Sequence, residues 1–303
     1  MVDGYNDHKL LWGYHYMVFG IRTDLAREAA ELCEGSLPEG VEMWEEERGG
    51  IRREIVEVRT EAAAQALGKP RGRYVSLSLE SLDRREEDAF LRSAAALSEE
   101  LGALLDLREG DGVLVAALGN RAITPDALGE YAAENVLVTK HLKELLPEEF
   151  RAFRPVTLLR CGVLGTTGLE SAVLVSAAAK LSHCRAVIAV DALCARSTDR
   201  LCKTVQLTDA GIVPGSGVGN ARTELSEATV GRPVAAIGLP TVVDAATLCA
   251  DLCGSAPENT APLFVTPRDI DTQVHSAGRL IGYAVNLALH PGLTVSDIDM
   301  LLG

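Results

Sequence analysis

Two aspartates, Asp126 and Asp191, each follow an apolar run, a placement that suits acid–base chemistry. The run at 113–118 reads as a buried strand, and the Thr-Pro-Asp sequence at 124–126 has the residue types of a helix start. The run at 186–190 reads as a second buried strand that leads straight into Asp191. Since parallel strands of one sheet place their carboxyl ends on the same edge, we expect the two carboxylates to face each other across a crevice.

Two carboxylates that share one site cannot both ionise easily, so the pKa of one rises. Such a pair supplies an acid and a base, which together can activate water at an amide bond. Taken alone, Asp126 also suits a simpler role, as a carboxylate that caps a helix and is favoured by the helix dipole. The second strand-end carboxylate at Asp191 favours the catalytic interpretation.

An α/β sheet must position these aspartates, and most of the chain predicts one. Strand-like runs alternate with segments of helical periodicity. Strands are expected at 55–58, 74–79, 113–118, 156–159, 186–190, 204–208 and 234–238, and helices at 23–33, 85–107, 124 to beyond His141, 171–182 and 271–290. We predict a three-layer, mostly parallel α/β fold in which the early strands form a smaller N-terminal β-containing extension.

The composition describes a soluble globular protein with a sizeable core. Of its 303 residues, 47% are hydrophobic and 24% are charged, and the net charge of -14 argues against binding to nucleic acid or an anionic membrane. The chain contains no apolar run of about 20 residues, the length of a membrane span, and no secretory signal is evident. Seven cysteines without a Cys-x-x-Cys spacing predict a reducing, cytoplasmic compartment, and the histidines show no spacing typical of a zinc site.

The glycine-rich loops do not have the spacing of nucleotide-binding motifs. The sequence at 215–220 is Gly-x-Gly-x-Gly rather than Gly-x-Gly-x-x-Gly, and 162–168 lacks the Lys-Ser/Thr of a P-loop. We therefore expect no ATP, NAD or other cofactor, and predict that the loop at 209–220 shapes the crevice. Cys161 and Cys194 are possible nucleophiles, but neither has an evident His–Asp partner, so small core or loop residues are the simpler interpretation.

Several segments together resemble the germination proteases of spore-forming bacteria, endopeptidases that degrade small acid-soluble spore proteins. The resemblance covers nearly the whole chain, with two departures, Cys161 where Pro is expected and Lys140 where Arg is usual. The matching segments include Leu118-Gly-Asn120, Thr124-Pro-Asp-Ala-Leu-Gly129, Val138-Thr-Lys-His-Leu142, Gly165-Thr-Thr-Gly168, Ile188-Ala-Val-Asp-Ala-Leu193, Pro214-Gly-Ser-Gly-Val-Gly-Asn220 and Pro240-Thr-Val-Val-Asp-Ala245.

The resemblance implies that Asp126 and Asp191 are the catalytic pair, on a fold similar to the hydrogenase-maturation proteases, whose equivalent carboxylates bind nickel. It also implies an enzyme of the forespore or spore core that acts on small acid-soluble spore proteins. A homotetramer is implied too, and the alternating strand at 74–79 offers a contact surface for it. The crevice is expected to be shaped by the following residues: Gly119, Asn120, Gly165, Thr166 and Asp209.

The resemblance further implies a zymogen that removes its own N-terminal segment. The order Asp-Leu-Ala at 24–26 is similar to the sites cut in the spore proteins, so we expect cleavage between Leu25 and Ala26. Residues 1–25 would then be an aromatic-rich processing segment, and 26–303 a single peptidase domain.

Two other functions remain open from the sequence. In a metal-assisted peptidase the same carboxylates would be metal ligands, joined by His141 or Asp209. A non-catalytic binding protein of the same fold is the second alternative, although the intact aspartates weigh against it.

Overall fold

A computed structural model describes residues 22–33, 35–217, 219, 222–254 and 263–303 of the chain. The strands are β1 (Val41–Arg48), β2 (Ile51–Val58), β3 (Gly72–Ser78), β4 (Val113–Leu118), β5 (Val156–Gly162), β6 (Ala186–Ala195), β7 (Thr204–Thr208), β8 (Val234–Asp244) and β9 (Phe264–Val265). The α-helices are α1 (Ala26–Glu31), α2 (Glu61–Leu67), α3 (Glu80–Asp83), α4 (Ala89–Leu105), α5 (Leu128–Ala133), α6 (Lys140–Leu145), α7 (Leu164–Thr167), α8 (Ser171–Ser182), α9 (Glu227–Val230), α10 (Ala245–Cys253), α11 (Ile270–Leu289) and α12 (Val295–Leu302). Short 3-10 helices span Thr124–Asp126 and Thr198–Arg200.

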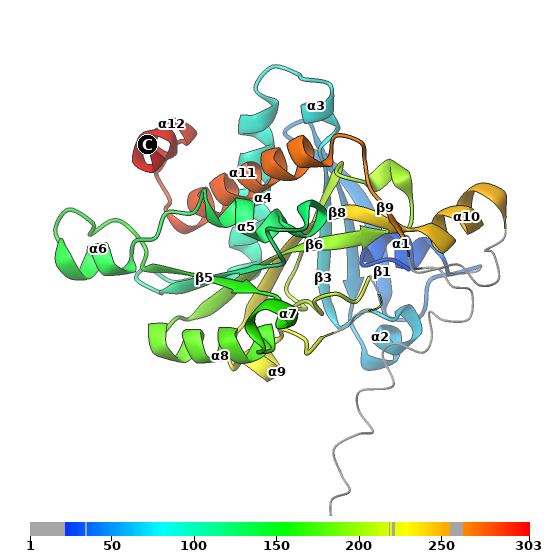
Figure 1. Ribbon diagram of the computed structural model, residues 1–303, viewed down its shortest axis with the longest axis horizontal. Coiled ribbons are helices and arrows are strands. Elements are labelled where there is room, and N and C mark those ends of the chain that lie inside the picture. Colours follow the sequence, from blue (N-terminus) through cyan, green and yellow to red (C-terminus); the bar gives the residue numbers. More distant parts are fainter. Residues whose placement is uncertain (1–21, 34, 218, 220–221, 255–262) are drawn as a thin grey trace, which may run out of the picture.

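All of these strands belong to one sheet with the order β1-β2-β3-β7-β8-β6-β4-β5, and β9 pairs with β8 (Figure 1). Strands β5, β4, β6 and β8 run parallel, as predicted for the centre of the sheet. Strand β7 differs from the prediction, because it is antiparallel to both β8 and β3. Together β1, β2 and β3 form the expected N-terminal β extension, continuous with the main sheet.

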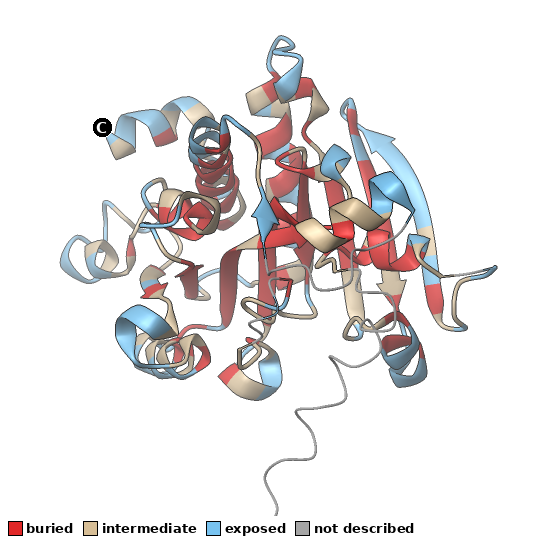
Figure 2. Cartoon of the chain, turned by 45° about the vertical axis from the view of Figure 1, so that its right-hand side comes forward, coloured by how far each residue is buried: buried red, intermediate tan, exposed pale blue. Residues whose placement is uncertain are grey.

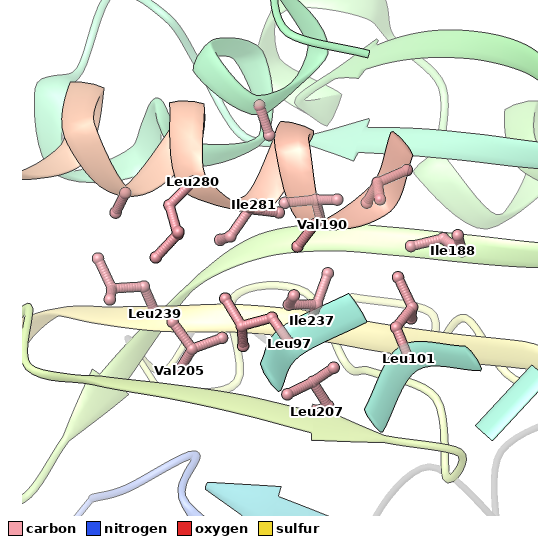
Figure 3. Packing of buried hydrophobic residues seen from close by; sticks show 14 of the residues in the cluster. Leu97, Leu101, Ile188, Val190, Val205, Leu207, Ile237, Leu239, Leu280 and Ile281 are labelled. Atoms are coloured by element: carbon pink, nitrogen blue, oxygen red, sulfur yellow. The ribbon is translucent and has the colours of Figure 1, made fainter. Parts of the chain in front are cut away.

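Helices cover both faces of the sheet, which confirms the three-layer α/β prediction. On one face, α4, α5 and α11 pack against the strands, and Figure 3 shows Leu97 and Leu101 of α4 and Leu280 and Ile281 of α11 among the residues of this cluster. The other face carries α8 and α9 over the parallel strands, and α1 and α2 over β2 and β3. The central strands are buried, whereas β1 at the sheet edge is largely exposed (Figure 2).

Strand β3 is more buried than its alternating sequence predicts. Tyr74, Val75, Ser76 and Leu77 are each less than 5% exposed, because β3 lies between β2 and β7 with helices over both faces. This strand therefore cannot supply the oligomer contact surface that we expected from its sequence.

The helix expected to run from 124 past His141 is interrupted. It consists of a 3-10 turn, then α5, which ends at Ala133, and the separate helix α6, where His141 is exposed. The break coincides with a contact from α11, whose Asn286 side chain accepts from the Leu137 N–H at 2.8 Å and donates to the Asn135 carbonyl. In the part of the chain that the structure describes, no helix is long and apolar enough to cross a membrane.

Candidate functional site

Asp126 lies in the 3-10 turn that follows β4, and the turn is held from two sides. Gly119 leaves the strand with a φ of +95°, and a Cβ there would lie 2.0 Å from the Asp126 carbonyl oxygen, so only glycine fits. The Asn120 N–H donates to that same carbonyl at 2.9 Å. From β8, the Thr241 hydroxyl donates to the Pro125 carbonyl at 2.7 Å. The predicted loop residues at 119–120 therefore set the position of Asp126.

Asp191 lies within β6 and is only 5% exposed. Its neighbour Val190 packs in the cluster under α4 and α11, so the alternation of the strand directs Asp191 to the opposite face. One carboxylate oxygen accepts from the Ala192 N–H at 2.9 Å. Since β4 and β6 are neighbouring parallel strands, both aspartates lie toward the same sheet edge.

The two carboxyls share one electrostatic environment. Burial raises the pKa of Asp126 to about 6, against the opposing effect of a hydrogen bond from the Asn120 backbone. The pKa of Asp191 is raised well above its ordinary value, first by burial and then by the negative charge of Asp126. Both shifts favour the protonated form, and a pair in which one carboxyl is ionised and the other keeps its proton could supply the base and the acid that water activation needs.

Gly165 and Thr166 are exposed in α7, which follows β5 at the same edge of the sheet. The Thr166 hydroxyl donates to the Val163 carbonyl at 2.9 Å, so this hydrogen bond lies within the start of α7. These residues can border the site, although the structure gives them no hydrogen bond to either aspartate among the described contacts.

Asp209 does not join the predicted crevice. It follows β7, whose antiparallel direction carries the chain toward the opposite edge of the sheet. There its exposed carboxylate accepts from the Arg73 N–H at 2.7 Å. The prediction assumed a parallel strand, which would have ended beside Asp191.

The proposed additional metal ligands also lie apart from the aspartates. His141 is exposed on α6, and Asp209 is bonded to β3. Within the described ranges, no three His, Cys, Asp or Glu side chains form a group that could hold a metal ion. Because catalytic zinc usually takes three protein ligands, the residues around Asp126 and Asp191 do not fit such a site.

Burial makes the two candidate cysteine nucleophiles poor ones. It raises the pKa of Cys161 and of Cys194 to about 12, with nearby carboxylates adding to the shift. Because the thiolate is the reactive form, both side chains behave as the small buried residues that their apolar segments suggest.

The expected processing junction, Leu25–Ala26, lies against strands β6 and β7. Leu25 and Ala26 are fully buried, and Leu25 packs with Leu193 of β6. Ala26 donates its N–H to the side chain of Gln206 in β7 at 2.8 Å. Sequence reasoning missed Gln206, because its contacts with Asp24 and Ala26 are distant in sequence and leave no local pattern. Residues 1–21 of the predicted processing segment lie outside the described residues.

The chain matches the family model described as germination protease over residues 23–254. It is 37% identical to the germination protease of Caldanaerobacter subterraneus, an alignment that covers 94% of this chain and 99% of that one. The Clostridium tetani protein is 35% identical over 93% of this chain, and the Bacillus subtilis protein 41% identical over 76%.

Among solved structures, a [NiFe] hydrogenase maturation protease, HycI from Thermococcus kodakarensis, covers 61% of this chain and 98% of its own, with 18% identity and a TM-score of 0.34. The family assignment rests on the sequence matches instead, which extend over both candidate aspartates. This chain belongs to the germination protease family and is a peptidase with a role in spore germination.

Proposed function

We propose that this chain is an endopeptidase that hydrolyses small acid-soluble spore proteins in the spore core, using Asp126 and Asp191 to activate water. The observation that carries the mechanism is the buried carboxyl pair, in which both pKa values are raised and the charge of one acts on the other. No nucleotide or metal cofactor is part of the proposal.

In the proposed mechanism one carboxyl acts as the base and the other as the acid, according to which of them carries a proton. Above pH 6 the Asp126 carboxylate is ionised and takes a proton from water as it attacks the peptide carbonyl. Asp191 keeps its proton in the more buried position and donates it to the leaving amine. Proton transfer from Asp126 to Asp191 through solvent or product then restores the starting state.

We include self-processing in this proposal, with cleavage between Leu25 and Ala26 of a zymogen that assembles as a homotetramer. The bond is buried against the protein's own strands, as the bond of a bound substrate would be. Mass spectrometry of the matured protein decides the cleavage position, and full activity of an uncleaved chain would overturn the inhibitory role of residues 1–25.

Asn substitutions test the carboxyl pair. D126N and D191N should each lower kcat/KM for a spore-protein substrate by at least roughly 10²–10⁴-fold, the usual contribution of an acid–base group. D209N is the matched control, because its carboxylate lies at the other sheet edge and should leave activity within about twofold of wild type. Near-normal activity in a folded D126N or D191N protein would overturn the mechanism.

Chelation separates this mechanism from the metal-assisted alternative. We expect the activity of the wild-type protein to survive prolonged treatment with a strong chelator, with no metal at stoichiometric level by elemental analysis. Loss of activity that returns on adding one divalent metal would replace the aspartate mechanism with the metal-assisted one.

A further inference from the structure

The far end of β6 has an open edge beside Asp191. Strand β4 pairs with β6 only as far as Val190, whereas β6 continues to Ala195 with β8 on its other side. On the open side, the Asp24 N–H donates to the Cys194 carbonyl at 2.8 Å. One backbone hydrogen bond therefore joins the N-terminal segment to this edge at Asp24, and the residues that follow cross the face of the sheet toward β7.

The side chain of Asp24 occupies a pocket of hydrogen-bond donors. Its carboxylate accepts from the Cys194 N–H at 2.8 Å and from the Ser216 hydroxyl at 2.6 Å. Gly217 closes the pocket, since a Cβ at this position would lie 2.2 Å from the Asp24 carboxylate and 2.3 Å from the Cys194 Cβ. Donors from two separate elements thus converge on one carboxylate.

A half-buried lysine lies next to the same segment. The Lys69 ammonium donates to the Thr23 carbonyl at 3.0 Å. Burial lowers the pKa of Lys69, and the negative charges of Asp24 and Glu28 oppose that change. Lys69 therefore lies beside the same segment as the two donors that bind the Asp24 carboxylate.

The backbone from Asp24 to Ala26 binds Gln206, which lies on the same face of the sheet as Asp191. The Gln206 amide donates to the Asp24 carbonyl at 3.2 Å, and its oxygen accepts from the Ala26 N–H at 2.8 Å. In the sheet, Gln206 and Asp191 both pair with Gly238, so they lie in one row two strands apart, roughly 10 Å between Cα atoms. Because residues in one row point to the same face, a peptide held by Gln206 lies near Asp191.

We propose that the Cys194 N–H and the Ser216 hydroxyl form the subsite that selects an acidic side chain in the substrate, with Asp24 as its first occupant and Gln206 positioning the backbone that follows. This inference rests on the proposed function, because it treats the docked segment as the first substrate of the enzyme. The substrate class is an extended peptide with a carboxylate side chain followed by an apolar residue. Ser216 and Gln206 act as specificity and positioning residues.

Self-processing of the full chain measures this selection, with mass spectrometry following the shortened product over time. D24N should slow processing roughly 10–100-fold, because it removes a charge held by two hydrogen bonds, while D24E should keep much of the rate. S216A should slow processing of the wild-type segment by about tenfold, and S216T should restore it. The matched control is S176A, which removes a hydroxyl from α8 on the same face and should process at the wild-type rate.

A double-mutant cycle separates selection from a merely structural effect. If Ser216 acts through the carboxylate, S216A should have little further effect in the D24N background, so the two substitutions are not additive. Equal processing of wild type and D24N, or fully additive effects of D24N and S216A, would overturn the subsite. Absence of processing in the wild-type chain itself would instead overturn the proposed function, and the subsite with it.

Discussion

Asp126 is half-buried and Asp191 is buried, and among the described residues neither carboxylate forms an ion pair with a basic side chain. Burial is the largest cause of the raised pKa of each, and hydrogen bonds from the backbone at Asn120 and Ala192 oppose it. A carboxyl whose pKa is higher in the folded than in the unfolded state costs stability once it ionises. The burial that raises the two pKa values therefore lowers the stability of the fold at a pH where a carboxyl is ionised.

The D126N substitution should make the protein more stable as it loses activity. The pKa of Asp126 is raised to about 6, so its favourable contribution is complete below the unfolded value near 4 and is lost as pH rises through 6. At pH 8 we expect D126N to raise the free energy of unfolding by about 1–3 kcal/mol, with little gain at pH 4. Urea denaturation at both pH values, with D209N as the exposed control, measures this, and equal gains at the two pH values would contradict it.

The pH dependence of kcat/KM should be bell-shaped. Activity falls on the acid side as Asp126 takes up a proton with an apparent pKa near 6, because the base must be ionised. On the alkaline side it falls as Asp191, whose pKa is raised well above its ordinary value, loses the proton it must donate. A profile that is flat from pH 5 to pH 7 would show that Asp126 is not the base.

At the scale of elements, the two aspartates are positioned by different means. Asp191 is part of a strand with a neighbour on each side over its first half, whereas Asp126 lies on a turn that β8 holds through one hydroxyl, that of Thr241. The turn has no side-chain cap of its own. The position of the base therefore depends on a contact from a strand that is distant in sequence.

Replacing Thr241 with Val should loosen the base without unfolding the protein. T241V keeps the shape of the side chain but removes the hydrogen bond to the Pro125 carbonyl, so we expect kcat to fall by roughly tenfold with KM little changed. The matched control is T266V, whose hydroxyl bonds to the Thr241 carbonyl rather than to the turn. Equal effects of the two substitutions on kcat would show that the hydrogen bond to the Pro125 carbonyl does not position Asp126.

Elements whose type follows from composition alone were predicted well. The runs at 113–118 and 186–190 are almost wholly apolar, and both are buried strands of the parallel core. Strand direction is not encoded in such a run, so the sequence predicts neither the antiparallel direction of β7 nor the position of Asp209 at the opposite edge of the sheet. The edge strand β1 was missed because half of its residues are glutamates, two of which, Glu42 and Glu45, pair with Arg59 and Arg27.

The candidate site was predictable to the extent that its residues follow strands. Asp126 and its loop at 119–120 belong to one local strand-turn unit, which a sequence reveals. Gln206 and Ser216 reach the segment at 24–26 through long-range contacts from β7 and from the loop after it, and such contacts leave no local pattern. The end of α5 is a similar case, since Asn286 of α11 binds the backbone where the helix stops.

At the scale of the whole molecule, the proposed tetramer would need contacts on the exposed surface. Strand β3, whose alternating sequence suggests a contact surface, is buried inside the sheet. Large apolar side chains are exposed elsewhere, among them Leu145 of α6 at 72% and Met300 of α12 at 73%. Helices α6 and α12 both project from the same side of the molecule (Figure 1).

We expect light scattering to give a mass four times that of the chain at micromolar concentration. Because each chain carries a net charge of -14, repulsion between copies should weaken assembly at low ionic strength, and added salt should favour the tetramer. The exposed substitutions L145S and M300S test the two helices, with E148Q as a control on the same surface. A monomeric mass at every salt concentration would contradict the tetramer.

The hydrogen bonds that hold residues 22–26 against β6 and β7 have a consequence for reaction order. A segment already docked on its own chain has a high effective local concentration, far above any concentration of free protein in a test tube. Cleavage of that segment by its own chain would be first order, so a hundredfold dilution would leave its half-time unchanged, whereas cleavage by a neighbouring molecule would slow in proportion. Each molecule would then set the time of its own maturation, independently of how many copies surround it.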